Sequence, residues 1–392
     1  MRTVRDIKNW RGKRALLRAD FNVPVEKGKV KDDFKIRKSL PTIKYLLAQG
    51  AKVVLVSHLG RPGGVDRKFT LEPVRKSLEA LLQEKVGLIK MKKPENYFRE
   101  AAAEIDKLKN GRALLLENIR FSKSEEENKN DFSRKLSELA DIFVLDGFAV
   151  AHRDASSVSG VARYLPAYAG LLLEEETRGL SRVVEGAVKP FVLVLGGAKM
   201  ETKIPVLKNL MSQADHILIG GGIANTYFWA RGYGVGASLV DKKFKEEILR
   251  LGAREKVVMP IDAVIGLENG KNAQVVKMAQ GVKIKNSEGI FDIGPATIRL
   301  YARFIKSANT LVWNGAMGYF EKHPYQYGTD AIARLVASRS KGKAFGVAGG
   351  GETVEVIRKL DLARDIDLVS TGGGAMLEFL AGKQLPGLKA LK

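Results

Sequence analysis

The chain has 392 residues, of which 45% are hydrophobic and 28% are charged, a balance typical of a soluble globular protein large enough for two domains. It contains no cysteine and only four histidines, which excludes a disulfide framework and thiolate chemistry and leaves little material for a zinc site. The formal net charge of +22 suggests a nucleic acid, polyanionic substrates, or no more than a solvated basic surface.

No targeting or membrane segment is predicted. No apolar run approaches the roughly 18 residues that a membrane-spanning helix needs, and the first residues, MRTVRDIKNWRGKR, are too polar for a secretory signal. The basic residues are spread along the chain without a basic tail or a helix-turn-helix pattern. We therefore expect a cytoplasmic protein with no membrane partner and no specific nucleic-acid partner.

The first half of the chain alternates apolar strands with helices. Strands are predicted at 14–21, 52–56, 113–116 and 142–145, and helices at 36–48, 70–82 and 128–139. This alternation predicts a parallel sheet covered on both faces, with ligands bound beyond the carboxyl ends of the strands.

Polar side chains follow each of these strands. They are Asp20, Asn22, His58, Arg61, Arg120, His152 and Arg153. An arginine alone is usually a surface ion pair, but several at the ends of neighbouring strands indicate a basic pocket. Because the guanidinium group binds phosphate and carboxylate bidentately, we expect this pocket to hold a small anion.

A long helix is predicted at 171–188, ended by Lys189-Pro190, and we expect it to connect two domains. The alternating pattern then restarts. Further strands are predicted at 191–195, 216–219, 257–260, 310–313, 344–348 and 367–369. Glycines and lysines follow these strands where arginines followed those of the first half, which suits a nucleotide.

Three glycine triplets, at 220–222, 349–351 and 372–374, each follow an apolar run. Each predicts a strand, a turn and a helix, whose free N–H groups and dipole favour a phosphate. Neither G-x-x-x-x-G-K-[ST] nor G-x-G-x-x-G occurs, which weighs against a P-loop enzyme and an ordinary dehydrogenase. Together with the basic pocket, the triplets suggest phosphoryl transfer across a cleft.

Eight motifs stand in the order found in phosphoglycerate kinases. They are RADFNVP at 18–24, SHLGRP at 57–62, ENIRF at 117–121, AHR at 151–153, LGGAK at 195–199, WNG at 313–315, GGGET at 349–353 and STGGGA at 370–375. The chain resembles the phosphoglycerate kinase family over essentially its whole length.

The resemblance implies two doubly wound, Rossmann-like α/β domains with parallel sheets, a joining helix and a hinge-bending cleft. Residues 1–170 would bind 3-phosphoglycerate and 190–380 the nucleotide, with 171–189 as the helix and 381–392 as a tail returning to the first domain. The reaction would be reversible transfer between ATP and the carboxylate of 3-phosphoglycerate, giving ADP and 1,3-bisphosphoglycerate. ATP/ADP and Mg²⁺ would be the cofactors, and we expect a monomer.

Site residues follow by motif. The resemblance implies that 3-phosphoglycerate is held by Asp20, Asn22, Lys35, His58, Leu59, Gly60, Arg61, Arg120 and Arg153. The nucleotide would be held by Gly197, Ala198, Lys199, Lys203, Gly221, Gly222, Gly294, Asn314, Glu321, Gly350, Gly351, Glu352 and Thr353, with Glu352 also binding magnesium. Lys35, Lys199, Gly351 and Gly373 would stabilise the transferred phosphoryl group.

The chain departs from the family pattern at three positions. Lys35 replaces an arginine, which keeps the charge but loses the bidentate fork, so we expect a slower enzyme unless Arg37 compensates. Glu352 stands where the family often has aspartate, and it remains a hard oxygen ligand. Ala316 stands where a proline usually follows WNG, which loosens that loop.

Two other functions stay open on the sequence. One is a weakly active homologue that binds polyanions, suggested by the charge of +22 and by Lys35. The other is a different doubly wound nucleotide enzyme, such as a dehydrogenase, although the missing G-x-G-x-x-G pattern weighs against it.

Overall fold

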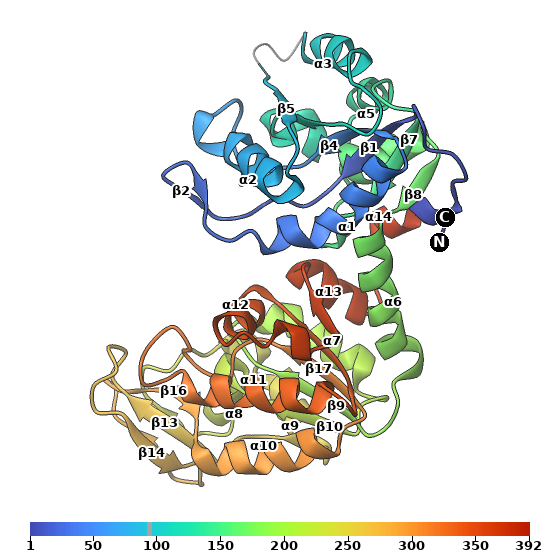
Figure 1. The fold of residues 1–392 in the computed structure, drawn as a ribbon. Helices are drawn as coiled ribbons and strands as arrows, with labels where there is room; N and C mark the ends of the chain where they lie inside the picture. Colours follow the sequence, from blue (N-terminus) through green and yellow to red (C-terminus); the bar gives the residue numbers. More distant parts are fainter. Residues whose placement is uncertain (92–95) are drawn as a thin grey trace. The chain divides into compact units, whose positions relative to one another are not determined.

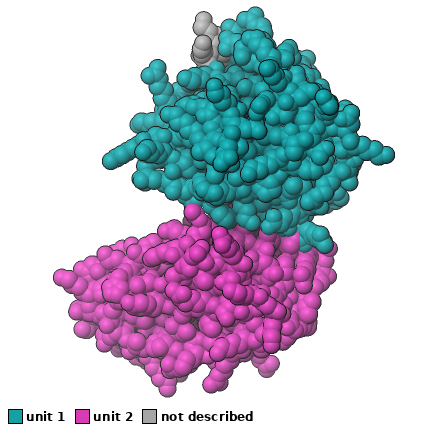
Figure 2. All heavy atoms as spheres, viewed as in Figure 1, with its two compact units in different colours: residues 1–178, 384–392 teal, residues 179–383 magenta. Residues whose placement is uncertain are grey.

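The chain forms two compact units in the computed structural model, which describes residues 1–91 and 96–392. Unit 1 comprises Met1–Arg178 and Gln384–Lys392, and unit 2 comprises Gly179–Lys383. Figure 2 colours them separately. Each is built on a six-stranded parallel sheet, so the predicted fold class, two doubly wound parallel-sheet α/β domains, is confirmed.

The sheet of unit 1 has the strand order β5-β6-β4-β1-β7-β8, and every neighbouring pair is parallel. Its strands are β1 (Arg14–Arg18), β4 (Lys52–Val56), β5 (Val86–Ile89), β6 (Ala113–Leu116), β7 (Ile142–Leu145) and β8 (Ala167–Ala169). All four residues of β7, and four of five in β1 and β4, are buried. Both faces of the sheet are therefore covered, which explains why these strands are continuous apolar runs.

Helices cover this sheet (Figure 1). They are α1 (Phe34–Ala48), α2 (Glu72–Leu82), α3 (Tyr97–Asp106), α4 (Lys123–Glu126) and α5 (Asn130–Ser137). A small hairpin, β2 (Val25–Glu26) and β3 (Lys29–Val30), precedes α1. The apolar core of unit 1 joins β1, β4 and β7 to α1 and α2 through side chains such as Leu17, Leu55, Ile43 and Leu78.

The sheet of unit 2 has the order β12-β10-β9-β17-β18-β19 and is also entirely parallel. Its strands are β9 (Phe191–Leu195), β10 (His216–Ile219), β12 (Val257–Val258), β17 (Thr310–Asn314), β18 (Phe345–Gly349) and β19 (Leu368–Ser370). Its central strands β9 and β17 are buried along their whole length. The carboxyl ends of these strands lie at one edge, where the glycine-rich turns follow.

The helices of unit 2 alternate with these strands (Figure 1). They are α7 (Met200–Leu210), α8 (Gly221–Ala230), α9 (Lys245–Gly252), α10 (Pro295–Ser307), α11 (Tyr327–Ser340), α12 (Gly351–Lys359) and α13 (Gly373–Leu380). An antiparallel sheet, β14 (Gln274–Lys277), β13 (Asp262–Gly266) and β16 (Gly289–Ile293), and a short pair, β11 (Gly234–Val235) with β15 (Lys283–Ile284), complete the unit.

Helix α6 (Leu171–Gly186) carries the boundary between the units, which falls between Arg178 and Gly179. The C-terminal residues 384–392 belong to unit 1. Their helix α14 (Pro386–Lys389) packs on the turn Ser156–Gly160, and the Gly387 N–H donates to the carbonyl of Ala151 at 2.8 Å.

The structure adds elements that the sequence pattern does not reveal. Strands β5 and β8 have only four and three residues, and only two residues in each are buried, so periodicity gives no signal for them. Helix α2 begins at Glu72, not Thr70, and the Thr70 hydroxyl lies before the helix, where it accepts from the Glu72 N–H at 3.3 Å and donates to Glu117 at 2.8 Å. In the described ranges, no helix combines the length and apolarity that crossing a membrane requires.

Candidate active site

Unit 1 places Asp20, Lys35 and His58 together beyond the carboxyl ends of β1 and β4. Lys35 Nζ lies 2.6 Å from Asp20 Oδ2, and His58 Nδ1 lies 3.8 Å from Asp20 Oδ1. Burial disfavours the Asp20 carboxylate, but the charge and hydrogen bond of Lys35, with smaller contributions from His58 and Arg18, outweigh burial and lower its pKa to about 2. Asp20 is therefore an anion that orients the Lys35 ammonium group and lies close to His58 without a hydrogen bond to it.

The SHLGRP loop is held against the neighbouring turns. The Gly60 N–H donates to Asn22 Oδ1 at 2.9 Å, and Arg120 Nη1 donates to the Gly60 carbonyl at 2.8 Å. The Leu59 carbonyl accepts from Asn118 Nδ2 at 2.8 Å, while the Leu59 side chain joins the apolar core. These bonds join the turns after β1, β4 and β6, so three separate motifs form one site.

Arginine side chains concentrate their charge in this pocket. Arg120 is nearly buried, and its pKa is lowered by burial and by the charge of Arg153, with Arg61 adding to the effect against Glu126 and Glu125. Arg61 itself is exposed. Arg153 Nε is buried and has no hydrogen-bond partner among the described residues. Like charges gathered in this way disfavour one another unless an anion binds between them.

Sequence reasoning assigned no role to Arg18, Ser157 and Glu125, which the structure places behind this pocket. Arg18 Nη2 lies 3.1 Å from His58 Nδ1, and Arg18 Nε donates to Ser157 Oγ at 2.8 Å. Ser157 Oγ in turn donates to Glu125 Oε1 at 2.5 Å. The three residues lie far apart in the sequence, and only the fold brings them together, so the motifs carry no signal for the network.

In unit 2 each glycine triplet begins a helix, as predicted. Helices α8, α12 and α13 start at Gly221, Gly351 and Gly373. The second and third turns are neighbours, because a Cβ added to Gly373 would lie 3.1 Å from the Cα of Gly350. Two helix N-termini with free N–H groups therefore meet at the edge of the sheet, an arrangement that suits phosphate groups.

The loop after β17 joins these turns to the one after β9. The carbonyls of Ala316 and Met317 accept from the Gly197 and Gly221 N–H groups at 2.7 and 2.8 Å. The Ala316 N–H lies 3.3 Å from Glu352 Oε2. The Ala316 N–H and carbonyl are thus both hydrogen-bonded, and these bonds hold the loop although no proline is present.

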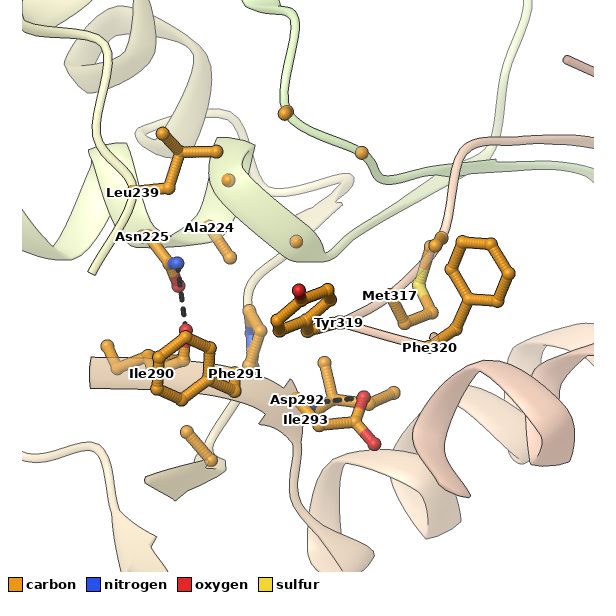
Figure 3. A pocket seen from close by; sticks show the side chains of 18 of the residues that line it. Ala224, Asn225, Leu239, Ile290, Phe291, Asp292, Ile293, Met317, Tyr319 and Phe320 are labelled. Atoms are coloured by element: carbon orange, nitrogen blue, oxygen red, sulfur yellow. Dashed lines mark hydrogen bonds between the residues drawn. The ribbon is translucent and has the colours of Figure 1, made fainter. Parts of the chain in front are cut away.

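A pocket of about 530 Å³ opens beside these turns. Figure 3 shows its apolar walls, including Leu239, Phe291, Met317 and Tyr319, and the hydrogen bond from Asn225 to the Ile290 carbonyl, which measures 3.2 Å. An apolar wall with glycine turns at its rim suits a flat base joined to phosphates. The sequence motifs assigned no role to these apolar side chains, and Leu239 lies outside all of the motifs.

Several residues predicted to bind the nucleotide line this pocket, and others lie apart from it. Those lining it are Gly197, Ala198, Gly221, Gly222, Glu321 and Glu352. Those absent from its lining are Lys199, Lys203, Gly294, Asn314, Gly350, Gly351 and Thr353. Gly294 instead precedes α10, with its N–H donating to the Asp262 carbonyl at 3.0 Å.

Two of the residues that lie apart from the pocket, Asn314 and Thr353, connect the turns that follow β17 and β18. Asn314 Nδ2 donates to the Gly349 carbonyl at 2.6 Å, and Thr353 Oγ1 accepts from the Gly315 N–H at 2.7 Å. Asn314 Oδ1 is buried and has no partner in the described structure. Both side chains therefore shape the glycine turns.

The two lysines of the LGGAK segment differ in their surroundings. Lys199 is exposed at the start of α7. Lys203 is only 7% exposed, and burial lowers its pKa to about 8 although the charge of Glu352 opposes this. Burial also raises the pKa of Glu321, with Glu352 and Glu355 adding to the rise. The negative charge of Glu352 therefore influences the pKa of both Lys203 and Glu321.

Comparison with known proteins identifies the family. The phosphoglycerate kinase family model matches residues 4–383. Relatives from Pelotomaculum thermopropionicum and Chloroflexus aggregans, both phosphoglycerate kinases, are each 44% identical, covering all of this chain and 98% of their own length.

Solved structures agree. Phosphoglycerate kinase from Coxiella burnetii matches with a TM-score of 0.85 and 38% identity, covering 99% of this chain and 98% of its own. The enzyme from Pyrococcus horikoshii matches with a TM-score of 0.86 and 32% identity, covering all of this chain and 98% of its own. The resemblance drawn from the eight motifs is thereby confirmed, and the chain belongs to the phosphoglycerate kinase family of phosphotransferases.

Proposed function

We propose that this chain catalyses reversible phosphoryl transfer between ATP and the carboxylate of 3-phosphoglycerate, giving ADP and 1,3-bisphosphoglycerate. The observation that carries the proposal is the arginine pocket of unit 1, in which Arg120 is buried close to Arg153 and Arg153 Nε has no hydrogen-bond partner among the described residues. A small substrate with a phosphate and a carboxylate would relieve that repulsion and match the guanidinium geometry. The nucleotide would then belong to unit 2.

In unit 1, the proposed ligands of phosphoglycerate are the residues beyond β1, β4 and β6, together with Arg153. Asp20 would hold Lys35 in place through its 2.6 Å contact, and Arg18 would hold His58 through the contact at Nδ1. Asn22, Gly60 and Arg120 would shape the loop that presents Arg61 to the substrate. Leu59 would contribute its backbone, because its side chain is in the core.

In unit 2, the apolar pocket would take the adenine base and the glycine turns the phosphates. Gly197, Ala198, Gly221 and Gly222 line its rim, and Glu321 lies where a carboxylate could accept hydrogen bonds from the ribose. Lys199 and Lys203 would pair with phosphates, and Thr353 and Asn314 would hold the turns in shape. Gly294 would support the pocket indirectly, by starting helix α10 beside Ile293.

Glu352 fits the part of a magnesium ligand. Among the described residues, no group of three or more histidine, aspartate or glutamate side chains could hold a metal by itself. Mg²⁺, however, is usually bound by one or two carboxylates together with substrate phosphates and water. The exposed carboxylate of Glu352 lies beside the nucleotide pocket and suits that mode. When bound, the ion would neutralise charge on the phosphates.

Catalysis would rest on positioning and on neutralising charge, because the acceptor carboxylate is already an anion and needs no strong base. Lys35 and Lys199 would supply positive charge to the transferred group. The N–H groups at Gly351 and Gly373, at the starts of α12 and α13, would donate hydrogen bonds to its oxygens.

Our expectations for the oligomeric state, location and partners of the chain follow from its family and charge. We propose that the chain acts as a monomer in the cytoplasm on these two small substrates, without a specific nucleic-acid or membrane partner. The basic residues are dispersed along the sequence, which favours a general attraction of anions over a shaped nucleic-acid surface.

The decisive experiment is steady-state turnover of 3-phosphoglycerate with Mg-ATP, coupled to reduction of the acyl phosphate. We expect turnover in the wild type and its near abolition in Lys199→Ala, while Lys208→Ala, an exposed lysine on the same helix, leaves it unchanged. Turnover that survives Lys199→Ala would remove this lysine from the mechanism. A wild type that binds both substrates without turnover would contradict the proposed function.

A further inference from the structure

A buried hydrogen-bond network runs from Glu125 to His58 in unit 1. Glu125 is 2% exposed, and its two carboxylate oxygens accept from Ser157 Oγ at 2.5 Å and from the Ser157 N–H at 2.9 Å. Ser157 Oγ accepts from Arg18 Nε at 2.8 Å, and Arg18 Nη2 lies 3.1 Å from His58 Nδ1. Four residues from four separate segments of the chain are thus joined by successive hydrogen bonds.

The direction of the last bond in this network is fixed by chemistry. A guanidinium group has only N–H donors, so a hydrogen bond between Arg18 and His58 requires Nδ1 to accept. Asp20 Oδ1, which could accept a proton from Nδ1, lies 3.8 Å away, beyond hydrogen-bond distance. With Nδ1 accepting, a neutral His58 carries its proton on Nε2.

Arg18 itself depends on the network for its orientation. Its side chain is buried, and its third nitrogen, Nη1, donates to the Ala19 carbonyl. Burial lowers the pKa of Arg18, and the charge of Glu125 is the largest influence opposing that shift, followed by Asp20. Without Ser157 and Glu125, a buried cation would lose both the acceptor of its Nε and its main compensating charge.

We propose that Glu125 is a positioning residue which, through Ser157 and Arg18, holds His58 in the tautomer that carries the proton on Nε2. His58 then presents a fixed N–H donor to the phosphoglycerate, a consequence that rests on the proposed function. Asp20 favours the opposite tautomer, because a proton on Nδ1 would be attracted to its carboxylate. The network from Glu125 to Arg18 therefore selects the Nε2–H tautomer of His58 over the Nδ1–H tautomer.

The tautomer can be measured directly on the substrate-free protein by ¹⁵N NMR of the imidazole nitrogens. The chain has only four histidines, and His58→Gln assigns the signal. We expect the Nε2–H form in the wild type and a shift toward the Nδ1–H form in Glu125→Gln and in Ser157→Ala. Glu127→Gln, the same change at an exposed residue paired with Lys129, serves as the matched control.

Two further measurements separate positioning from stability. Ser157→Thr retains the hydroxyl, so we expect it to keep the wild-type tautomer of His58. If Ser157 had only a structural role, Ser157→Thr and Ser157→Ala would give the same imidazole spectrum. In turnover, Ser157→Ala raises KM for 3-phosphoglycerate about ten-fold, because it weakens a hydrogen bond to an anion, and leaves KM for Mg-ATP unchanged.

The outcomes are distinct. A wild-type His58 with its proton on Nδ1, or an unshifted tautomer in both Glu125→Gln and Ser157→Ala, overturns the proposal. A shifted tautomer with no effect on KM supports the positioning role and contradicts the placing of His58 at the phosphoglycerate. If Glu125→Gln does not fold, Ser157→Ala alone decides the question.

Discussion

The resemblance to the family predicts an arginine at the position of Lys35. Its ammonium group pairs with Asp20 at 2.6 Å, and its side chain is 28% exposed. Arg37 does not replace it, since its guanidinium is 60% exposed and pairs at 2.8 Å with Asp33, the residue that precedes α1. The chain thus offers one ammonium group where the family has a planar fork.

Replacing Lys35 by arginine tests the cost of that difference. We expect Lys35→Arg to raise kcat, by at most the roughly 10²–10³-fold that one preorganised donor to an oxyanion is worth. The measurement is steady-state turnover at saturating substrates, with Arg37→Lys as the control. An unchanged kcat in Lys35→Arg would mean that Lys35 does not limit the rate.

Lys203 is a buried lysine whose protonation depends on its surroundings. Its pKa is lowered to about 8 in the folded chain from an ordinary value of 10.5. The unfolded chain therefore holds this proton more tightly, so the cost of burying the charge is fully present below pH 8 and disappears as the pH rises toward 10.5. A polyphosphate nearby would favour the charged form and offset that cost.

We therefore expect nucleotide binding to take up a proton above about pH 8 and to weaken as the pH rises. Titration calorimetry of ADP at pH 8.5, in buffers of different ionisation enthalpy, measures the uptake. Lys203→Met removes it, and Lys208→Met, an exposed lysine on α7, retains it. Equal uptake in Lys203→Met and wild type would place Lys203 away from the phosphates.

At the scale of elements, the turn between β18 and α12 depends on one glycine conformation. Gly350 has a φ of +104°, which L-residues rarely adopt, and a Cβ added there would lie 3.0 Å from Asn314 Nδ2. The same turn adjoins the start of α13. The geometry of two helix N-termini therefore rests on this position.

We expect Gly350→Ala to destabilise unit 2 by about 1–3 kcal/mol, the usual cost of a strained backbone conformation, and to lower activity. Calorimetric thermal unfolding measures the loss. Gly186→Ala, in helix α6 with no atom near the added Cβ, should leave unfolding unchanged or raise its temperature slightly. Equal unfolding of the two variants would contradict the strain argument.

At the scale of the whole molecule, the net charge of +22 attracts anions in general, both the substrates and other polyanions. The family match does not favour the alternative of a polyanion-binding protein. We expect RNA binding to fall steeply with salt and to be lost at physiological ionic strength. A salt titration of labelled RNA measures this, and micromolar binding that survives physiological salt would favour a second role.

The sequence by itself determined the family, the fold class and the central strands. Buried parallel strands such as β4 and β9 are continuous apolar runs, and the glycine triplets start helices, so local chemistry was sufficient there. Short pieces such as β8 gave no signal, because three residues contain no period. Motifs also located the residues at the strand ends, since a parallel sheet places all carboxyl ends at one edge.

Only the tertiary structure decided which side chains meet. The apolar pocket wall is built from Leu239, Phe291 and Tyr319, which come from three separate segments of the chain. The network from Glu125 to His58 joins residues up to 139 positions apart along the chain. Contacts of this kind depend on register and packing between elements, which the linear pattern of apolar and polar residues does not specify.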